Sequence, residues 1–186
     1  NAKGDILSRL INDIDNIINN SDGILIARVD LGIELPIERI PGIQKSIINK
    51  CHQNGKFSIV AVDMVIQDEE DDEPTRAEVS DVANAVLDGV DAIMLTGKTA
   101  KGIYPVETIF TINKILDEAE TEVDYYSFMD KALRTENRDI SGVIAHDVAS
   151  SAMHLNCKAI YAPTISGYTA RKISRFRPIC PIIAAS

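Results

Sequence analysis

Short apolar runs rich in Ile and Val recur along the chain, and most of them are preceded by a turn and followed by a small or polar residue. Runs of about five such residues are typical of strands that are buried on both faces. The pattern predicts strands at residues 24–28, 58–62, 92–96, 159–163 and 181–185.

Helical patterns lie between these runs. One helix is predicted near the start of the chain, because one face would collect Ile6, Leu10, Ile14, Ile17 and Ile18. Similar spacing predicts further helices at residues 37–51, 77–87, 106–119, 125–134 and 141–155. An order of strand, helix, strand, with strands roughly 30–35 residues apart, predicts βα units on a parallel sheet.

The regular alternation breaks after the third predicted strand. No strand is predicted between Thr96 and Ala159, which places a boundary near residues 121–124. We therefore expect one α/β unit at residues 1–120 and the start of another at residues 121–186. Three strands are too few for a closed barrel, which needs eight, and two strands make a poor sheet. The chain is thus expected to be a fragment of a longer protein.

Composition narrows the function classes. Of the 186 residues, 45% are hydrophobic, which is typical of a globular protein. The formal net charge of −9 argues against a nucleic-acid binder, which needs a basic surface, and no apolar run is long enough to span a membrane. The three cysteines are widely spaced and fit neither a disulfide framework nor a metal motif. Reduced thiols and a cytoplasmic location are expected.

Polar residues at the carboxyl ends of the predicted strands are the candidates for chemistry. After the first strand, Asp30 offers a carboxylate for Mg²⁺, but capping of the next turn is the simpler interpretation. After the third strand, Gly97 and Lys98 resemble the end of a phosphate-binding P-loop. The glycine that this motif requires five positions earlier is Ala92, which excludes a P-loop.

A segment rich in hydroxyl groups follows the fourth predicted strand. Residues 164–169 lead into a helix that is expected to begin near Ala170. Hydroxyls and free amides at a helix start can form an anion site, whereas Ser166 or Thr169 could instead be an ordinary N-cap. The pattern leaves both interpretations open. The acidic run at residues 68–73 is expected to be a solvated loop.

Four segments of the chain contain distinctive motifs. Residues 21–32 are similar to SDGI…ARGDLG, residues 74–89 to PTRAE and SDVANAVLDG, residues 93–105 to IMLSGETAKG-x-YP, and residues 166–178 to SGRTA…RP. These segments resemble motifs of the pyruvate kinase family, the last of them from the family's C-terminal domain. The matches run in order across nearly the whole chain, which makes the resemblance highly specific.

The resemblance implies an architecture and a reaction. The fold would be the C-terminal βα units of a TIM (β/α)₈ barrel followed by part of an α/β C-terminal domain. The reaction would be transfer of a phosphoryl group from phosphoenolpyruvate to ADP in glycolysis. The family uses Mg²⁺ and K⁺ as cofactors and works as a homotetramer.

The family's site residues carry over position by position. Asp30 would be a Mg²⁺ ligand, and the backbone amides around Val29 and Asp30 would hold substrate oxygens. Arg28 would help to fix that loop, and Val62 occupies the position of a Thr that contacts the substrate. The loop that binds a sugar-phosphate activator in allosteric members corresponds to Thr164, Ser166, Gly167 and Thr169.

The chain departs from the family at several of these positions. Val29 replaces the Gly of ARGDLG, where a β-branched side chain would crowd the substrate. Val62 replaces the Thr of ATQM and lacks its hydroxyl. Other departures change polarity or charge. Asp63 stands in place of a Gln and Lys98 in place of a Glu. In the activator loop, Ile165 replaces a Glu and Tyr168 replaces an Arg.

The resemblance leaves open whether the parent protein is active. The family's KIE segment, with a phosphate-facing Lys and a second Mg²⁺ carboxylate, would precede Asn1, and the lid domain and the K⁺ site would also lie outside the chain. We therefore expect the chain alone to be inactive. The first hypothesis is a segment of an active pyruvate kinase, and the alternative is a catalytically degenerate homologue kept as a binding or regulatory subunit. A third option is an unrelated phosphate-binding barrel.

Overall fold

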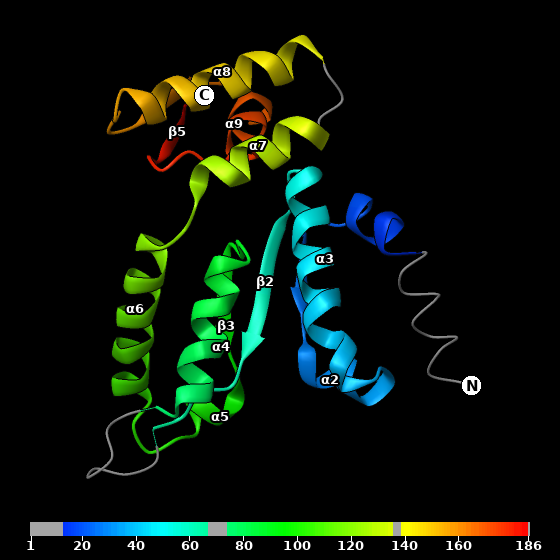
Figure 1. The fold of residues 1–186 in the computed structure, drawn as a ribbon, viewed down its shortest axis with the longest axis vertical. Helices are drawn as coiled ribbons and strands as arrows, with labels where there is room; N and C mark the ends of the chain where they lie inside the picture. Colours follow the sequence, from blue (N-terminus) through cyan, green and yellow to red (C-terminus); the bar gives the residue numbers. More distant parts are fainter. Residues whose placement is uncertain (1–12, 67–73, 136–138, 186) are drawn as a thin grey trace. The chain divides into compact units, whose positions relative to one another are not determined.

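Two units, each built on its own parallel sheet, make up the described part of the chain (Figure 1). The computed structural model describes residues 13–66, 74–135 and 139–185. The acidic run and the first half of the predicted N-terminal helix lie outside these residues. The two units are Asn1–Cys51 with Lys56–Val123, and His52–Gly55 with Asp124–Ser186.

The first unit contains a sheet of three parallel strands in the order β1-β2-β3. The strands are β1 (Gly23–Ile26), β2 (Phe57–Val62) and β3 (Ala92–Leu95). Gly23 pairs with Phe57, and Ile59 pairs with Ala92. All three carboxyl ends therefore lie at the same edge of the sheet. The prediction of βα units on a parallel sheet is confirmed.

Helices connect these strands, and the long ones pack against one face of the sheet (Figure 1). They are α2 (Arg28–Glu34), the 3₁₀ helix η1 (Ile37–Arg39), α3 (Ile40–Gln53), α4 (Arg76–Leu87), α5 (Gly97–Ala100) and α6 (Pro105–Thr121). Residues 13–19 are helical as well. Side chains from the strands and the helices meet in one core, which includes Ile18, Ile26, Ile48, Val60, Val62, Val82 and Ile112.

The strands are less buried than the sequence pattern suggests. Val60 is fully buried on the face that packs against the helices, but Phe57 on the same strand is 49% exposed. Leu25 and Met94 are exposed as well, because they point to the opposite face, which the described helices do not cover. The expectation that each strand is buried on both faces is wrong for the described part of the chain.

The second unit contains a sheet of two parallel strands, in which Ile160 pairs with Ile182. Its elements are α7 (Tyr125–Thr135), α8 (Ile140–His154), β4 (Ile160–Pro163), α9 (Tyr168–Ser174) and β5 (Ile182–Ala185). Phe176 is completely buried in its core, against small residues of α8. The two predicted helices that precede β4 are confirmed, and the described residues between β3 and β4 contain no strand.

The three cysteines are all free thiols. Burial raises the pKa of the Cys51 thiol to about 11, so this thiol stays protonated at neutral pH.

Within the residues that the structure describes, no helix is long and apolar enough to cross a membrane.

A capping box fixes the start of α4. The Thr75 hydroxyl accepts a hydrogen bond from the Glu78 amide at 3.3 Å, and the Glu78 carboxylate accepts one from the Thr75 amide at 2.9 Å. Each side chain thereby satisfies an amide that the helix itself leaves unpaired. The box matters for the site because α4 carries Asp81.

Removing this cap should destabilise the first unit. We expect Thr75→Ala to lower the free energy of unfolding by about 1 kcal/mol, as measured by urea denaturation followed by circular dichroism. A matched control is Thr111→Ala in α6, since no described residue hydrogen-bonds to the Thr111 side chain. Equal losses in the two variants would contradict the capping role.

Candidate functional site

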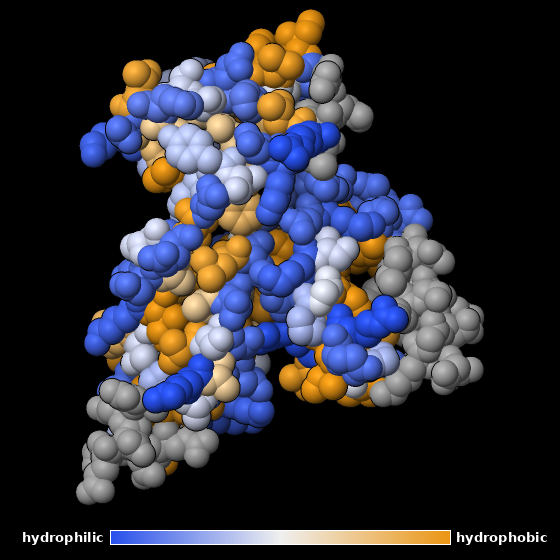
Figure 2. Space-filling view, in the orientation of Figure 1, coloured by the Kyte–Doolittle hydropathy of each residue, from blue (hydrophilic) through white to orange (hydrophobic). Residues whose placement is uncertain are grey.

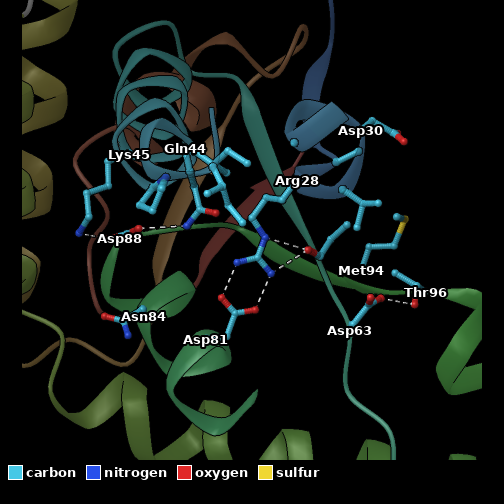
Figure 3. A pocket seen from close by; sticks show the side chains of 17 residues that line it. Arg28, Asp30, Gln44, Lys45, Asp63, Asp81, Asn84, Asp88, Met94 and Thr96 are labelled. Carbon is cyan, nitrogen blue, oxygen red and sulfur yellow. Dashed lines mark hydrogen bonds and ion pairs between the residues drawn. The ribbon is translucent and has the colours of Figure 1, made fainter. Parts of the chain in front are cut away.

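A cavity of about 870 Å³ lies at the carboxyl ends of the strands of the first unit. Residues that follow β1, β2 and β3 line it together with residues of α2, α3 and α4. Most of its polar side chains are paired with one another (Figure 3). The charged residues that line it are Arg28, Asp30, Lys45, Asp63, Asp81 and Asp88.

Arg28 lies at the centre of this cavity (Figure 3). The first strand was expected to run to Arg28, but β1 ends at Ile26 and Arg28 begins α2. Its Nε and Nη2 groups donate to the Ala61 carbonyl at 3.2 and 3.0 Å, and Nη1 and Nη2 donate to the two carboxylate oxygens of Asp81. The hydrogen bond with Asp81 raises the pKa of the Arg28 guanidinium. These hydrogen bonds, which we call the Arg28 fork, thus connect the start of α2 to β2 and to α4.

Asp63, just beyond the end of β2, forms a second junction. Its Oδ1 accepts a hydrogen bond from the Thr96 hydroxyl at 2.6 Å, and its Oδ2 accepts one from Lys98 Nζ at 2.7 Å. The Lys98 ammonium and the Thr96 hydroxyl hold the pKa of the Asp63 carboxyl below its usual range. These contacts connect the end of β2 to the turn between β3 and α5.

A third set of contacts joins α3 to the end of α4. Asp88 accepts hydrogen bonds from Gln44 Nε2 at 3.1 Å and from Lys45 Nζ at 2.6 Å. The Asp88 side chain is only 7% exposed, whereas that of Lys45 is 60% exposed. Gln44, Lys45 and Asp88 all line the cavity, so these contacts form its wall between α3 and α4.

Asp30 is the exposed carboxylate of the cavity, and no described residue forms a hydrogen bond or ion pair with it. The described residues include no group of three side chains that could hold a metal ion. Mg²⁺ is commonly bound by one or two carboxylates together with substrate phosphates. The Asp30 carboxylate therefore fits one position in such a site, and other ligands have to complete it.

The structure brings together some of the residues singled out in the sequence. Arg28, Val29 and Asp30 all line the cavity. Val62 does not: its side chain is 1% exposed and packs in the hydrophobic core. Lys98 lies at the edge of the site through its ion pair with Asp63.

The hydroxyl-rich loop lies in the second unit, between β4 and α9. The helix begins at Tyr168, earlier than expected, and its N-cap is Gly167, which has a φ of 75° and no capping side chain. An ordinary cap by Ser166 or Thr169 is therefore wrong. A glycine takes this left-handed conformation at little cost, so the backbone alone turns the chain into the helix. Ile165 is fully exposed.

Sequence reasoning missed Asp81 and Asp88 as parts of the site. The two carboxylates are seven residues apart, which is two turns of a helix, and they fall on the same face. That spacing was the available signal. Their partners Arg28 and Lys45 come from other elements, and only the folded chain shows the pairing.

Comparisons with known proteins identify the family. A family model described as "Pyruvate kinase, barrel domain" matches residues 7–109, and one described as "Pyruvate kinase, alpha/beta domain" matches residues 143–186. The chain belongs to the pyruvate kinase family. Both the resemblance inferred from the motifs and the predicted α/β fold class are thereby confirmed, and the unrelated phosphate-binding barrel is excluded.

Individual relatives cover most of the chain. It is 46% identical over 176 residues to the pyruvate kinase of Sporosarcina psychrophila, covering 95% of the chain and 30% of that protein. It is equally similar to the pyruvate kinase of Clostridium acetobutylicum, of which it covers 37%. A crystal structure of pyruvate kinase from Cryptosporidium parvum matches 94% of the chain and 36% of its own length, with 39% identity and a TM-score of 0.82. The chain thus spans about a third of the length of these pyruvate kinases.

The Arg28–Asp81 pair should stabilise the first unit more than the Lys45–Asp88 pair does. Asp81→Ala would leave a part-buried guanidinium without its carboxylate, and we expect it to lower the free energy of unfolding by about 1–3 kcal/mol. Lys45→Ala removes an exposed ammonium and should cost less than about 1 kcal/mol. Urea denaturation of both variants measures the difference, and an equal or reversed order would contradict it.

Proposed function

We propose that this chain is part of an active pyruvate kinase, which transfers a phosphoryl group from phosphoenolpyruvate to ADP and so yields pyruvate and ATP. The main support from the structure is the start of α2, where Arg28 is fixed by Asp81 and the nearby Asp30 carboxylate is left unpaired by the described residues. We assign residues 1–120 to the barrel domain and residues 121–186 to the C-terminal α/β domain. Identity of 41–46% to pyruvate kinases over most of the chain does not favour the degenerate alternative.

Asp30 would hold Mg²⁺ through its carboxylate, together with ligands from outside the described residues. The bound metal would neutralise charge on the phosphoryl oxygens, which is the main requirement of this chemistry. Arg28 has a positional role. A guanidinium carries five N–H donors, and four of the hydrogen-bond contacts they can make go to Ala61 and Asp81. It therefore has little capacity left to grip a phosphate with two hydrogen bonds.

The first turn of α2 would contribute backbone amides. Its N-cap, Ala27, supplies no capping side chain, so the amides around Val29 and Asp30 are free to donate to substrate oxygens. The Val29 side chain is 68% exposed beside them and would narrow the approach of a substrate. The assignment of Val62 to a substrate contact stays a prediction from the resemblance. Its side chain is buried in the core, so the structure adds no support for it.

The remaining assignments extend the same proposal to the parent protein. It would use K⁺ as well as Mg²⁺, assemble as a homotetramer and work in glycolysis in the cytoplasm. The loop of Thr164, Ser166, Gly167 and Thr169 would bind a sugar-phosphate activator. Support comes from its position after β4 and from the fact that no side chain there caps α9.

Activity is tested on a full-length protein that contains this chain. We expect turnover of phosphoenolpyruvate and ADP in the presence of Mg²⁺ and K⁺, recorded by coupling pyruvate to the oxidation of NADH. The 186-residue chain alone should show none, because the phosphate-facing Lys and the second metal carboxylate would lie outside it. A folded full-length protein without turnover would sink the proposal and favour the degenerate homologue.

The metal assignment is tested on the same full-length protein. We expect Asp30→Ala to weaken the binding of Mg²⁺ at least about tenfold, since even the loss of a group that only supports a metal ligand commonly costs that much. Glu34→Ala is the matched control, because Glu34 is an exposed carboxylate on the same helix. Affinity can be followed by Mn²⁺ titration with electron paramagnetic resonance and Mg²⁺ competition. Unchanged affinity in Asp30→Ala would remove Asp30 from the metal site.

A further inference from the structure

Two positions at which the chain departs from its family motifs lie in direct contact. Asp63 stands where the ATQM motif has Gln, and Lys98 stands where the SGET motif has Glu. Their side chains form an ion pair, with Lys98 Nζ 2.7 Å from Asp63 Oδ2. A neutral Gln has thus been replaced by the acidic Asp63, and an acidic Glu by the basic Lys98. The two new charges neutralise each other.

We propose that Lys98 is a positioning residue, which holds the Asp63 carboxylate and thereby keeps Arg28 paired with Asp81. Its bearing on catalysis rests on the proposed function, because Arg28 begins the helix that carries Val29 and Asp30. The pairing itself is a property of the fold of the first unit.

Asp63 and Asp81 are rival partners for one guanidinium. Arg28 donates to the Ala61 carbonyl, and Asp63 follows only two residues later. Asp63 and Arg28 also line the same cavity (Figure 3), and the charge of each shifts the pKa of the other toward the ionised form. In the structure Arg28 makes its carboxylate contacts with Asp81.

Lys98 explains why Arg28 pairs with Asp81 and not with Asp63. Both Asp63 oxygens are engaged, one by Thr96 and the other by Lys98. Without the ammonium, Oδ2 would lose its partner, and Arg28 is the other cation whose charge acts on this carboxylate. A charge-assisted hydrogen bond to Arg28 would then form at the expense of the fork with Asp81. The start of α2 would move with the guanidinium.

The exchange at position 98 follows from the one at position 63. A neutral Gln at position 63 would not attract Arg28, so no cation would be needed at position 98. Once position 63 carries a carboxylate, a Glu at position 98 would repel it and push it toward Arg28. Lys98 removes that conflict. Its side chain is 71% exposed, and an exposed ion pair adds little stability, so its effect is on geometry.

The test uses a full-length protein that contains this chain and needs no catalysis, so its failure is distinct from failure of the proposed function. Proton–nitrogen correlation spectra record the Arg28 guanidinium, assigned by its disappearance in Arg28→Lys, and the backbone amides of Val29 and Asp30. We expect Lys98→Met to shift these signals, because the Arg28 guanidinium would exchange its two hydrogen bonds to Asp81 for a charge-assisted hydrogen bond to Asp63.

The decisive variant is the double one. Asp63→Asn removes the rival carboxylate, so Asp63→Asn with Lys98→Met should restore the wild-type guanidinium and α2 signals. Lys101→Met is the matched control, since it removes an exposed Lys just beyond α5 and should change nothing. Should Lys98→Met fail to fold in a thermal melt, the pair Lys98→Glu and Asp63→Gln/Lys98→Glu gives the same comparison.

Two outcomes would overturn the proposal. In the first, Lys98→Met leaves the Arg28 signals unchanged, which would mean that Lys98 does not position Arg28. A double variant as perturbed as Lys98→Met, or more so, would show that the two side chains only stabilise the turn. Restoration by the second substitution is the result that a purely structural role does not produce.

Discussion

The first unit depends on one guanidinium fork. Arg28 belongs to α2, Ala61 to β2 and Asp81 to α4, and the Arg28 side chain forms hydrogen bonds to both of the other elements. Sheet hydrogen bonds align the strands and apolar packing holds the long helices on one face, but neither sets the start of α2 to the precision that the proposed metal site requires. The fork does so because a planar group with several donors restricts both direction and distance. The position of Asp30 follows from it.

Two other carboxylates near the cavity have hydrogen-bond partners of their own and do not pair with Arg28. Asp63 is held by Thr96 and Lys98, and Asp88 by Gln44 and Lys45. Asp30 is the one lining carboxylate that no described residue engages. Elsewhere the first unit has exposed apolar side chains on α2 and α6, such as Ile33 and Phe110, and Figure 2 shows hydrophobic surface among the hydrophilic residues of this unit.

Much of the fold could be predicted from the sequence, and much of the site could not. The apolar runs and helical spacing placed the strands and the longer helices to within a few residues but did not predict α2 or α5, and the motifs placed the chain in its family. Burial was overestimated for Leu25 and Met94, because a run of apolar residues does not reveal how many faces its neighbours cover. The contacts of Asp63 and Asp81 join residues 33 to 53 positions apart, and no local pattern encodes such pairs. The helix start at Gly167 was missed because hydroxyl groups nearby offered a simpler cap.

That glycine has an evolutionary consequence. Since backbone conformation alone starts α9, the hydroxyls of Ser166 and Thr169 do not cap the helix. Substitutions at these positions can therefore change the chemistry of the loop without removing a helix cap. Ile165 and Tyr168, which are exposed and unlike the residues of the family motif, fit such a history. In the loop proposed to bind an activator, the side chains that would recognise the ligand are thus separate from the glycine that starts the helix.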